Sequence, residues 1–329
     1  VLDYVGAWRQ RMLDNGGIIP TNIGLDGKIG GACGGKWYGG VYGWGFSVIN
    51  PVTRGRVNRN YHHVAINGFG NAFLLTGDDR FLDAWRKQLD AVNSHAKVEG
   101  GRSLYPHMHG DQGWYDFRPE PYRAGALELY YWSMKEPDRR RVPDDAWFTF
   151  LEGRNPAYPE TALRGDFAVI RRKVEAMRRD TTTPDTRLAD DPMAYNPATV
   201  GSLVHLMLGG LPPKHQGEVL QARIRYFDPI RRRPGLPEDV AALVDSLKED
   251  STSLVLVNLN QAEARTLVVQ GGAYGEHLCE RVETGERTTA VSHPSFRVDL
   301  APGSGGRLTV AMKRYTVQPT LAPPWDHDD

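Results

Sequence analysis

The segment YHHVAINGFGNAFLLTGDDRFLDAWRKQLDAVNSHAK, residues 61–97, carries the clearest periodic pattern in the chain. Its apolar residues recur at helical spacing on both sides of a turn at Thr76–Asp79. This pattern predicts one helix over about 61–75 and a second over about 80–96. Two helices joined by so short a turn form an antiparallel αα-hairpin.

Helical spacing also appears in four other stretches before residue 250, namely residues 1–13, 122–137, 162–180 and 197–210. After about residue 252, short β-branched runs are separated by Gly, Pro and Asn turns, which predicts an antiparallel β-sandwich. We therefore expect a mainly α domain over residues 1–250 and a β-sandwich domain over residues 251–329.

Composition excludes several classes of partner. The chain has 40 Lys and Arg against 40 Asp and Glu, so it lacks the basic footprint of a nucleic-acid-binding protein or a polybasic membrane anchor. No apolar run reaches the roughly 18 to 20 residues that span a bilayer. The two cysteines, Cys33 and Cys279, cannot form the framework of a disulfide-dense fold, so we expect free thiols.

The first residues of the chain have the pattern of a helix and not that of a signal peptide. Residues 1–20 lack the basic, apolar and small-residue sections of a signal peptide. The chain opens without methionine on VLDYVGAWRQRML, whose apolar residues recur at roughly helical spacing. We therefore expect that further helices precede residue 1 in a longer natural chain.

The segment GGKWYGGVYGWGF, residues 34–46, packs six glycines and five aromatic rings into thirteen positions. Glycines let a backbone turn tightly and approach a ligand, and aromatic rings offer flat faces for stacking on sugars. We interpret Trp37, Tyr38, Tyr42 and Trp44 as a carbohydrate platform. The alternative is that these rings fill the core of the α domain.

An uncharged polar stripe follows in NRNYHHVAINGFGN, residues 58–71. Asn60, His63, Asn67 and Asn71 share one helix face, and the apolar residues occupy another. A face exposed only to water would normally carry Lys and Glu. The stripe therefore indicates a cleft or an internal polar network that ties hairpins together.

A second group of reactive side chains lies in YPHMHGDQGWYDFRPEPYR, residues 105–123. His107, His109 and Asp111 are suitable ligands for a divalent metal, although no cofactor is required by the pattern. Tyr105 is a candidate for proton transfer. Arg118 and Arg123 are candidates for bidentate binding of an acidic sugar. The alternative is a loop held by salt bridges.

A family resemblance rests on LLTGDDRFLDAWRKQLD, residues 74–90, which resembles the turn between inner and outer helices of six-hairpin carbohydrate-active enzymes. The β domain follows in the order found in heparinase-like and alginate-lyase-like polysaccharide lyases. The resemblance implies an α/α toroid, incomplete at its N-terminus, followed by a β-sandwich. It also implies action on a polysaccharide or oligosaccharide in the periplasm or outside the cell.

The resemblance further implies a lyase that cleaves a uronic-acid-containing glycan by β-elimination. In such enzymes Asn and His neutralise the uronate carboxylate, and Tyr or His moves protons. The Asn-Asn-His motif corresponds to Asn58, Asn60, His62 and His63, interrupted by Arg59 and Tyr61. The implied catalytic residues are Asn60, His62, His63, Tyr105, His107 and Asp111. The implied substrate-binding residues are Trp37, Tyr38, Tyr42, Trp44, Asn67, Trp114, Arg118 and Arg123.

Two alternatives stay open. A glycoside hydrolase needs two carboxyl groups across the scissile bond, and the candidates are Asp26, Asp111, Asp116, Glu120 and Glu128. A non-catalytic glycan-binding protein would keep the aromatic platform without convergent His and Tyr groups. The sequence leaves the glycan, the endo or exo mode and the oligomeric state undetermined.

Overall fold

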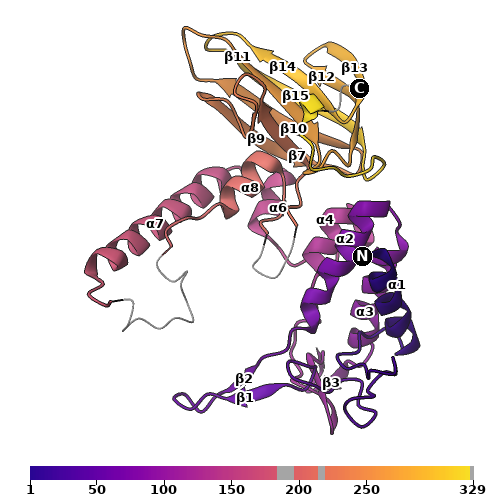
Figure 1. Ribbon diagram of the computed structural model, residues 1–329. Coiled ribbons are helices and arrows are strands. Elements are labelled where there is room, and N and C mark those ends of the chain that lie inside the picture. The colour runs from indigo at the N-terminus through magenta and orange to yellow at the C-terminus, as the bar shows by residue number, and fades with distance from the viewer. Residues whose placement is uncertain (184–195, 214–218, 327–329) are drawn as a thin grey trace. The chain divides into compact units, whose positions relative to one another are not determined.

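The computed structural model describes residues 1–183, 196–213 and 219–326, and Figure 1 labels its helices and strands. The chain divides into two compact units, which are Val1–Pro143 (unit 1) and Asp144–Asp329 (unit 2).

Unit 1 combines helices with three short two-stranded hairpins. Its helices are α1 (Leu2–Asp14), α2 (Ile66–Thr76), α3 (Arg80–Asn93), α4 (Ala126–Ser133) and α5 (Glu136–Arg139), with a 3-10 turn, η1 (His62–Ala65), directly before α2. The strand pairs are β1 (Ser47–Ile49) with β2 (Arg56–Asn58), β3 (Lys97–Glu99) with β4 (Arg102–Leu104), and β5 (Met108–Gly110) with β6 (Gly113–Tyr115).

The α2–α3 hairpin forms where the sequence predicts it. Gly77 ends α2 in the left-handed conformation, with φ of 65°, and its N–H donates to the carbonyl of Phe73 at 2.7 Å. A glycine accepts this conformation without the steric cost of a Cβ atom. Buried side chains on both helices, including Phe69, Trp85 and Leu89, form the core of unit 1.

Two polar side chains, the buried Gln88 and the partly buried Asn93, fasten long loops to this hairpin. On α3, Gln88 accepts a hydrogen bond from the N–H of Ile19 at 2.7 Å. Asn93, at the end of α3, exchanges two hydrogen bonds with the backbone of Tyr122, at 3.0 and 2.8 Å. The ring N–H of Trp44 donates to the carbonyl of Ile19 at 2.9 Å. Residues far apart in sequence are therefore held against one helix.

Unit 2 begins with helices and continues with strands. Its helices are α6 (Ala146–Leu151), α7 (Tyr158–Arg179) and α8 (Gly201–Leu208), with a 3-10 turn, η2 (Pro324–Asp326), near the C-terminus. Its strands are β7 (Ile224–Asp228), β8 (Arg233–Pro234), β9 (Val240–Leu247), β10 (Ser251–Asn258), β11 (Arg265–Gly271), β12 (Leu278–Thr284), β13 (Arg287–His293), β14 (Ser295–Leu300) and β15 (Gly305–Lys313).

These strands form two antiparallel sheets. One has the order β13-β12-β15-β10-β9 and the other β14-β11-β7-β8. In β10, buried residues alternate with partly exposed ones along the whole strand, as expected when one face of a sheet is covered. Antiparallel strands near the C-terminus agree with the sequence prediction. They begin at β7, before the predicted boundary at residue 250, which falls in the β9–β10 turn.

The expected α/α toroid is wrong. The described residues contain eight α-helices over about 30% of the chain, too few for six helical hairpins. The molecule is a mixed α and β protein. The physical reason lies in residues 15–60 and 94–125, whose frequent Gly, Pro and aromatic residues form loops and short strand pairs where a toroid needs helices.

Candidate functional site

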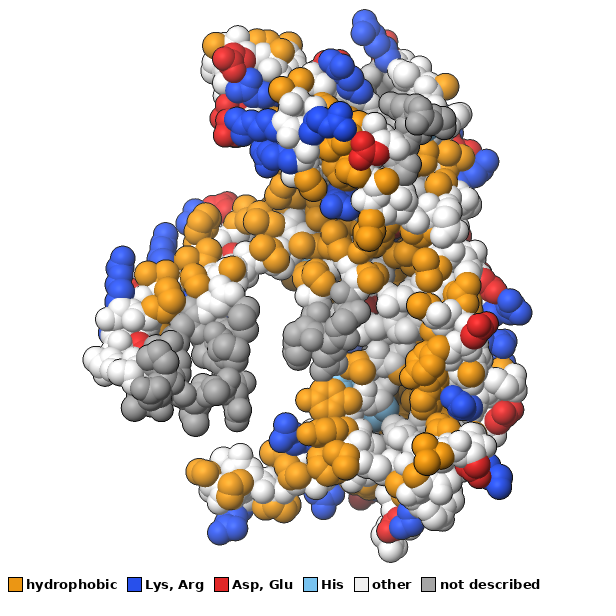
Figure 2. All heavy atoms as spheres, in the orientation of Figure 1, with side chains coloured by type: hydrophobic (Ala, Val, Ile, Leu, Met, Phe, Trp, Pro, Cys, Tyr) orange, Lys and Arg blue, Asp and Glu red, His pale blue; other side chains and the backbone are white. Residues whose placement is uncertain are grey.

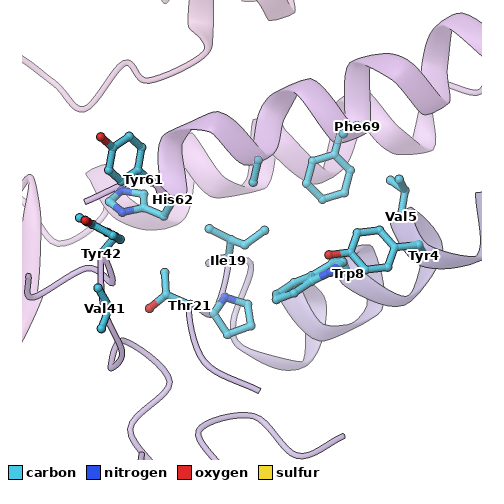
Figure 3. A pocket seen from close by; sticks show the side chains of 13 residues that line it. Tyr4, Val5, Trp8, Ile19, Thr21, Val41, Tyr42, Tyr61, His62 and Phe69 are labelled. Carbon is cyan, nitrogen blue, oxygen red and sulfur yellow. The ribbon is translucent and has the colours of Figure 1, made fainter. Parts of the chain in front are cut away.

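A cavity of about 610 Å³ opens in unit 1 between α1, the loop after it and the start of α2 (Figure 3). We call it the aromatic pocket. It is lined by Tyr4, Val5, Trp8, Ile19, Pro20, Thr21, Val41, Tyr42, Tyr61, His62, Ala65, Gly68 and Phe69. Its size lies in the range of small-molecule sites.

The α1 side of the aromatic pocket carries two rings. Tyr4 and Trp8 are one helical turn apart, so they share a face of α1, and their rings meet edge to face at 6.2 Å. Tyr4 is 67% exposed. Its ring therefore makes little contribution to the core and is free to contact a ligand.

The opposite end carries Tyr42 and Tyr61, with His62 beside them (Figure 3). The Tyr42 and Tyr61 rings are 5.0 Å apart and nearly perpendicular. The N–H of Tyr61 donates to the carbonyl of Tyr42 at 3.0 Å, which fixes the two backbones together. Both side chains are 40% exposed. Figure 2 shows hydrophobic side chains gathered on unit 1 beside the pale blue of histidine.

His62 lines the pocket from a buried position. Only 6% of its surface is exposed, and its ring stacks on Trp44 at 3.6 Å with 13° between the planes. Its Nδ1 atom is buried without a hydrogen-bond partner in the described part of the chain. Burial, with a smaller contribution from nearby His63, lowers the pKa of His62 to about 3. The imidazole is therefore uncharged at neutral pH.

The lining as described includes no Asp, Glu, Lys or Arg side chain. Its polar atoms are the hydroxyls of three tyrosines and Thr21, the Trp8 ring N–H and the His62 ring nitrogens. This combination of aromatic faces and uncharged hydrogen-bonding atoms suits a neutral, amphipathic ligand.

A second hollow of about 760 Å³, which we call the charged groove, lies in the same unit. It is lined by Cys33, Lys36, Tyr38, Gly39, Gly40, Gly45, Phe46, Arg56, Gly110, Asp111, Gln112 and Tyr115. The Lys36 ammonium lies 2.7 Å from Asp111, and the Tyr38 hydroxyl donates to the same carboxylate oxygen at 2.9 Å. The hydrogen bonds from Lys36 and Tyr38 lower the pKa of Asp111.

The platform predicted in residues 34–46 is divided between several environments. Tyr42 lines the aromatic pocket, whereas Tyr38 lines the charged groove. Trp37 is partly buried against His109, with ring centroids 4.7 Å apart. Trp44 is fully buried and faces His62 instead of solvent. A single flat stacking surface formed by all four rings is therefore absent, because Trp44 belongs to the core.

The predicted polar stripe is divided as well. Asn60 donates to the sulfur of Met108 at 2.8 Å. His63 is exposed, and its ring lies 6.2 Å from Tyr61 at 22°. Asn67 is partly buried on α2. Asn60, His63 and Asn67 are not among the residues that line the aromatic pocket, whereas the neighbouring His62 is.

The 105–123 stretch forms a tight loop with internal pairs. The backbones of Tyr105 and Arg118 exchange hydrogen bonds at 2.7 and 2.9 Å. The Arg118 guanidinium pairs with Asp116 at 2.6 Å, and Asp116 also accepts from Asn58 at 3.0 Å. Arg123 is exposed. This arrangement matches the alternative of a loop held by salt bridges for Arg118.

The three residues considered for a metal face different neighbours. His107 is within hydrogen-bond distance of the Glu120 carbonyl, at 3.1 Å. His109 packs between aromatic rings, with Trp114 at 4.8 Å. Asp111 pairs with Lys36. Within the residues that the structure describes, no group of three or more His, Cys, Asp or Glu is arranged to hold a metal ion.

Among the lining residues that sequence reasoning missed are Tyr4, Trp8 and Tyr61 in the aromatic pocket and Lys36 and Arg56 in the charged groove. The i, i+4 spacing of Tyr4 and Trp8 was a readable signal for one aromatic helix face. Nothing in the sequence placed that face beside residues 41–42 and 61–62.

The fold and the site together define a two-unit α and β protein with an uncharged aromatic pocket on a helical-hairpin unit. The chain belongs to the family described as a domain of unknown function (DUF8034), whose model matches residues 1–105 and 142–204. The first matched range contains every residue that lines the aromatic pocket. No curated protein and no solved structure matches the chain. Among the described helices, none has the length and apolar character to cross a bilayer.

Proposed function

We propose that unit 1 binds carbohydrate and that the aromatic pocket stacks a sugar ring. The observation that carries this proposal is the uncharged cavity of about 610 Å³ bordered by the rings of Tyr4, Trp8, Tyr42 and Tyr61. A pyranose ring has an apolar C–H face and a rim of hydroxyl groups. Aromatic faces with polar tips complement both parts of such a ligand.

The hydrogen-bonding atoms of the pocket support a sugar over a purely apolar ligand. The side chains of Tyr4, Tyr42 and Tyr61 line the pocket, and a tyrosine hydroxyl can both donate and accept a hydrogen bond. Because His62 is uncharged, its ring can donate one hydrogen bond and accept another. A hydroxyl group, which also donates and accepts, is a suitable partner.

The test is binding of a glycan panel followed by Tyr4→Ala. Tyr4 is 67% exposed, so its removal should leave folding intact. Loss of one stacking ring should weaken binding roughly tenfold, as measured by isothermal titration calorimetry. Phe167→Ala, an exposed aromatic in unit 2 at 57% exposure, is the matched control and should bind as wild type. Equal affinity of Tyr4→Ala and wild type for every bound glycan would reject the stacking site.

Elimination of a uronate-containing glycan is a second candidate function. One observation favours it: the pocket combines an unprotonated imidazole, His62, with the tyrosine side chains of Tyr42 and Tyr61. In this candidate the neutral imidazole accepts the sugar proton and a tyrosine hydroxyl supplies one to the leaving oxygen. The low pKa makes His62 a weak base, and the lining as described has no cation to neutralise a uronate carboxylate, so elimination ranks behind binding. The pocket lining offers no pair of carboxyl groups, so the hydrolase alternative has no support there.

The elimination candidate has its own readout. A new carbon–carbon double bond in the product would raise ultraviolet absorbance when the wild type acts on an acidic glycan. His62→Phe, which keeps a ring to stack on Trp44, should abolish that rise. Glycan binding without any rise in absorbance would reject elimination and leave the binding proposal in place.

A further inference from the structure

We propose that the charged groove is a second carbohydrate subsite, adjacent to the aromatic pocket, that takes an anionic sugar unit of the same chain. This inference rests on the proposed function, because it extends the glycan from one site into the other. The anionic group is a carboxylate or a sulfate, which share the chemistry of a bidentate oxygen acceptor.

The two sites share one stretch of backbone. Gly39 and Gly40 line the charged groove, and the next two residues, Val41 and Tyr42, line the aromatic pocket. Gly40 has φ of 97°, a conformation that glycine accepts and that turns the chain between the two sites. A ligand with linked sugar units can therefore contact both sides of this short segment.

The segment that supplies eight of the twelve residues lining the groove carries charge of one sign only. Residues 27–77 contain five Lys and Arg and no Asp or Glu, although the whole chain is balanced at 40 of each sign. Three of these cations, Arg54, Arg56 and Arg59, lie on or directly beside the β1–β2 hairpin. Across the described residues, none of the three forms a salt bridge, whereas Arg80 and Arg118 pair with Asp78 and Asp116.

Arg56 is the cation that the groove presents to a ligand. Its guanidinium lies 5.6 Å from the centre of the Tyr115 ring. The Tyr115 hydroxyl donates to the carbonyl of Gly45 at 3.4 Å, which holds the ring in place. Stacking on an aromatic ring orients a guanidinium and leaves its N–H edge free for a planar oxyanion.

Lys36 and Asp111 form an ion pair in the groove, which adds hydrogen-bonding groups without adding net charge. Asp111 compensates Lys36 at 2.7 Å, so Arg56 supplies the net positive charge among the lining residues. A carboxylate such as Asp111 accepts hydrogen bonds from sugar hydroxyls, and Lys36 and Tyr38 hold it in position. Gly45 lets the backbone of His109 pack closely against the groove wall, since a Cβ atom at this position would lie 3.0 Å from the carbonyl oxygen of His109.

The test compares three oligosaccharides of equal length by calorimetry: a carboxylated oligogalacturonide, a sulfated galactan fragment and a neutral galactan fragment. Arg56→Gln should weaken binding of the carboxylated or sulfated probe roughly tenfold and leave the neutral probe unchanged. Added salt should weaken the anionic probe in wild type and have a smaller effect in Arg56→Gln. The two anionic arms identify which oxyanion the groove accepts. Arg102→Gln, an exposed arginine on β4, is the matched control.

Three outcomes would overturn the inference. An unchanged affinity of Arg56→Gln for both anionic probes would exclude the groove as their site. An equal loss for the neutral probe would show a general structural effect. Polyglutamate binding as tightly as the anionic glycans would indicate a site for any polyanion. Failure of all glycans to bind is a different result, because it would reject the proposed function itself together with this extension.

Discussion

At the scale of single residues, His62 links the site to the stability of unit 1. Burial lowers the pKa of its imidazole to about 3 in the folded state, against 6.5 for an ordinary histidine. The unfolded chain therefore binds more protons than the folded chain between these two values. Stability from this group is fully present above about pH 6.5 and decreases as the pH falls toward 3, by up to about 5 kcal/mol.

The matching prediction uses His62→Phe, which keeps an aromatic ring against Trp44 and removes the titration. Between about pH 6 and pH 4 the urea midpoint of wild type should fall more steeply than that of the variant. Parallel midpoint curves for the two proteins would mean that His62 is protonated as easily in the folded state as in the unfolded chain.

At the scale of elements, α2 depends on one glycine and tolerates replacement of another. A Cβ atom at Gly70 would overlap the Trp132 ring on α4, so this close contact between the two helices requires glycine. Gly68, half a turn earlier, has the Val5 side chain at 4.0 Å as its nearest neighbour. Both glycines have φ in the ordinary helical range, which isolates the effect of packing.

We expect opposite results from two alanine substitutions on α2. Gly70→Ala should destabilise unit 1 by about 2 kcal/mol because overpacking forces the Trp132 ring or the helix to move. Gly68→Ala should stabilise it by about 0.5 to 1 kcal/mol because alanine favours the helix. Chemical denaturation of both variants tests this. A similar change in both would show that helix propensity, and not the Trp132 contact, determines their effect.

At the scale of the whole molecule, the two units carry titrating groups with opposite effects. In unit 2, Glu276 is 1% exposed and accepts hydrogen bonds from the N–H groups of Ala273 and Tyr274. Burial raises the pKa of its carboxyl from 4.5 to about 7. The folded state then binds more protons than the unfolded state between these values. Stability from Glu276 is fully present below about pH 4.5 and is lost as the pH rises through 7.

The prediction for unit 2 is made with Glu276→Gln. Wild type should lose up to about 3 kcal/mol from this group as the pH rises from about 5 to 8, and the variant should lose less. Amide hydrogen exchange of β11 and β12, corrected for intrinsic rates, measures the change within unit 2. If protection in the variant falls with pH as much as in wild type, Glu276 does not titrate in this range.

Part of this molecule follows from local sequence. The spacing of apolar residues in 61–97 predicted the α2–α3 hairpin, and the β-branched runs after residue 252 predicted antiparallel strands. Both depend on contacts between residues near in sequence, which amphipathic periodicity records. The number of helices was overestimated because an αα-hairpin occurs in many architectures and does not specify that further hairpins follow.

The candidate site, too, combines features that are local in the sequence with contacts that only the folded chain makes. By itself, the sequence determined that residues 34–46 and 58–71 are rich in rings, glycines and uncharged polar groups, because composition and helical spacing are local properties. Only the tertiary structure decided that Trp44 is buried against His62 and that Tyr4 and Trp8 face Tyr42 and Tyr61. These placements depend on contacts across long loops, such as Gln88 and Trp44 holding the backbone of Ile19. No local pattern records which distant surface such a loop will meet.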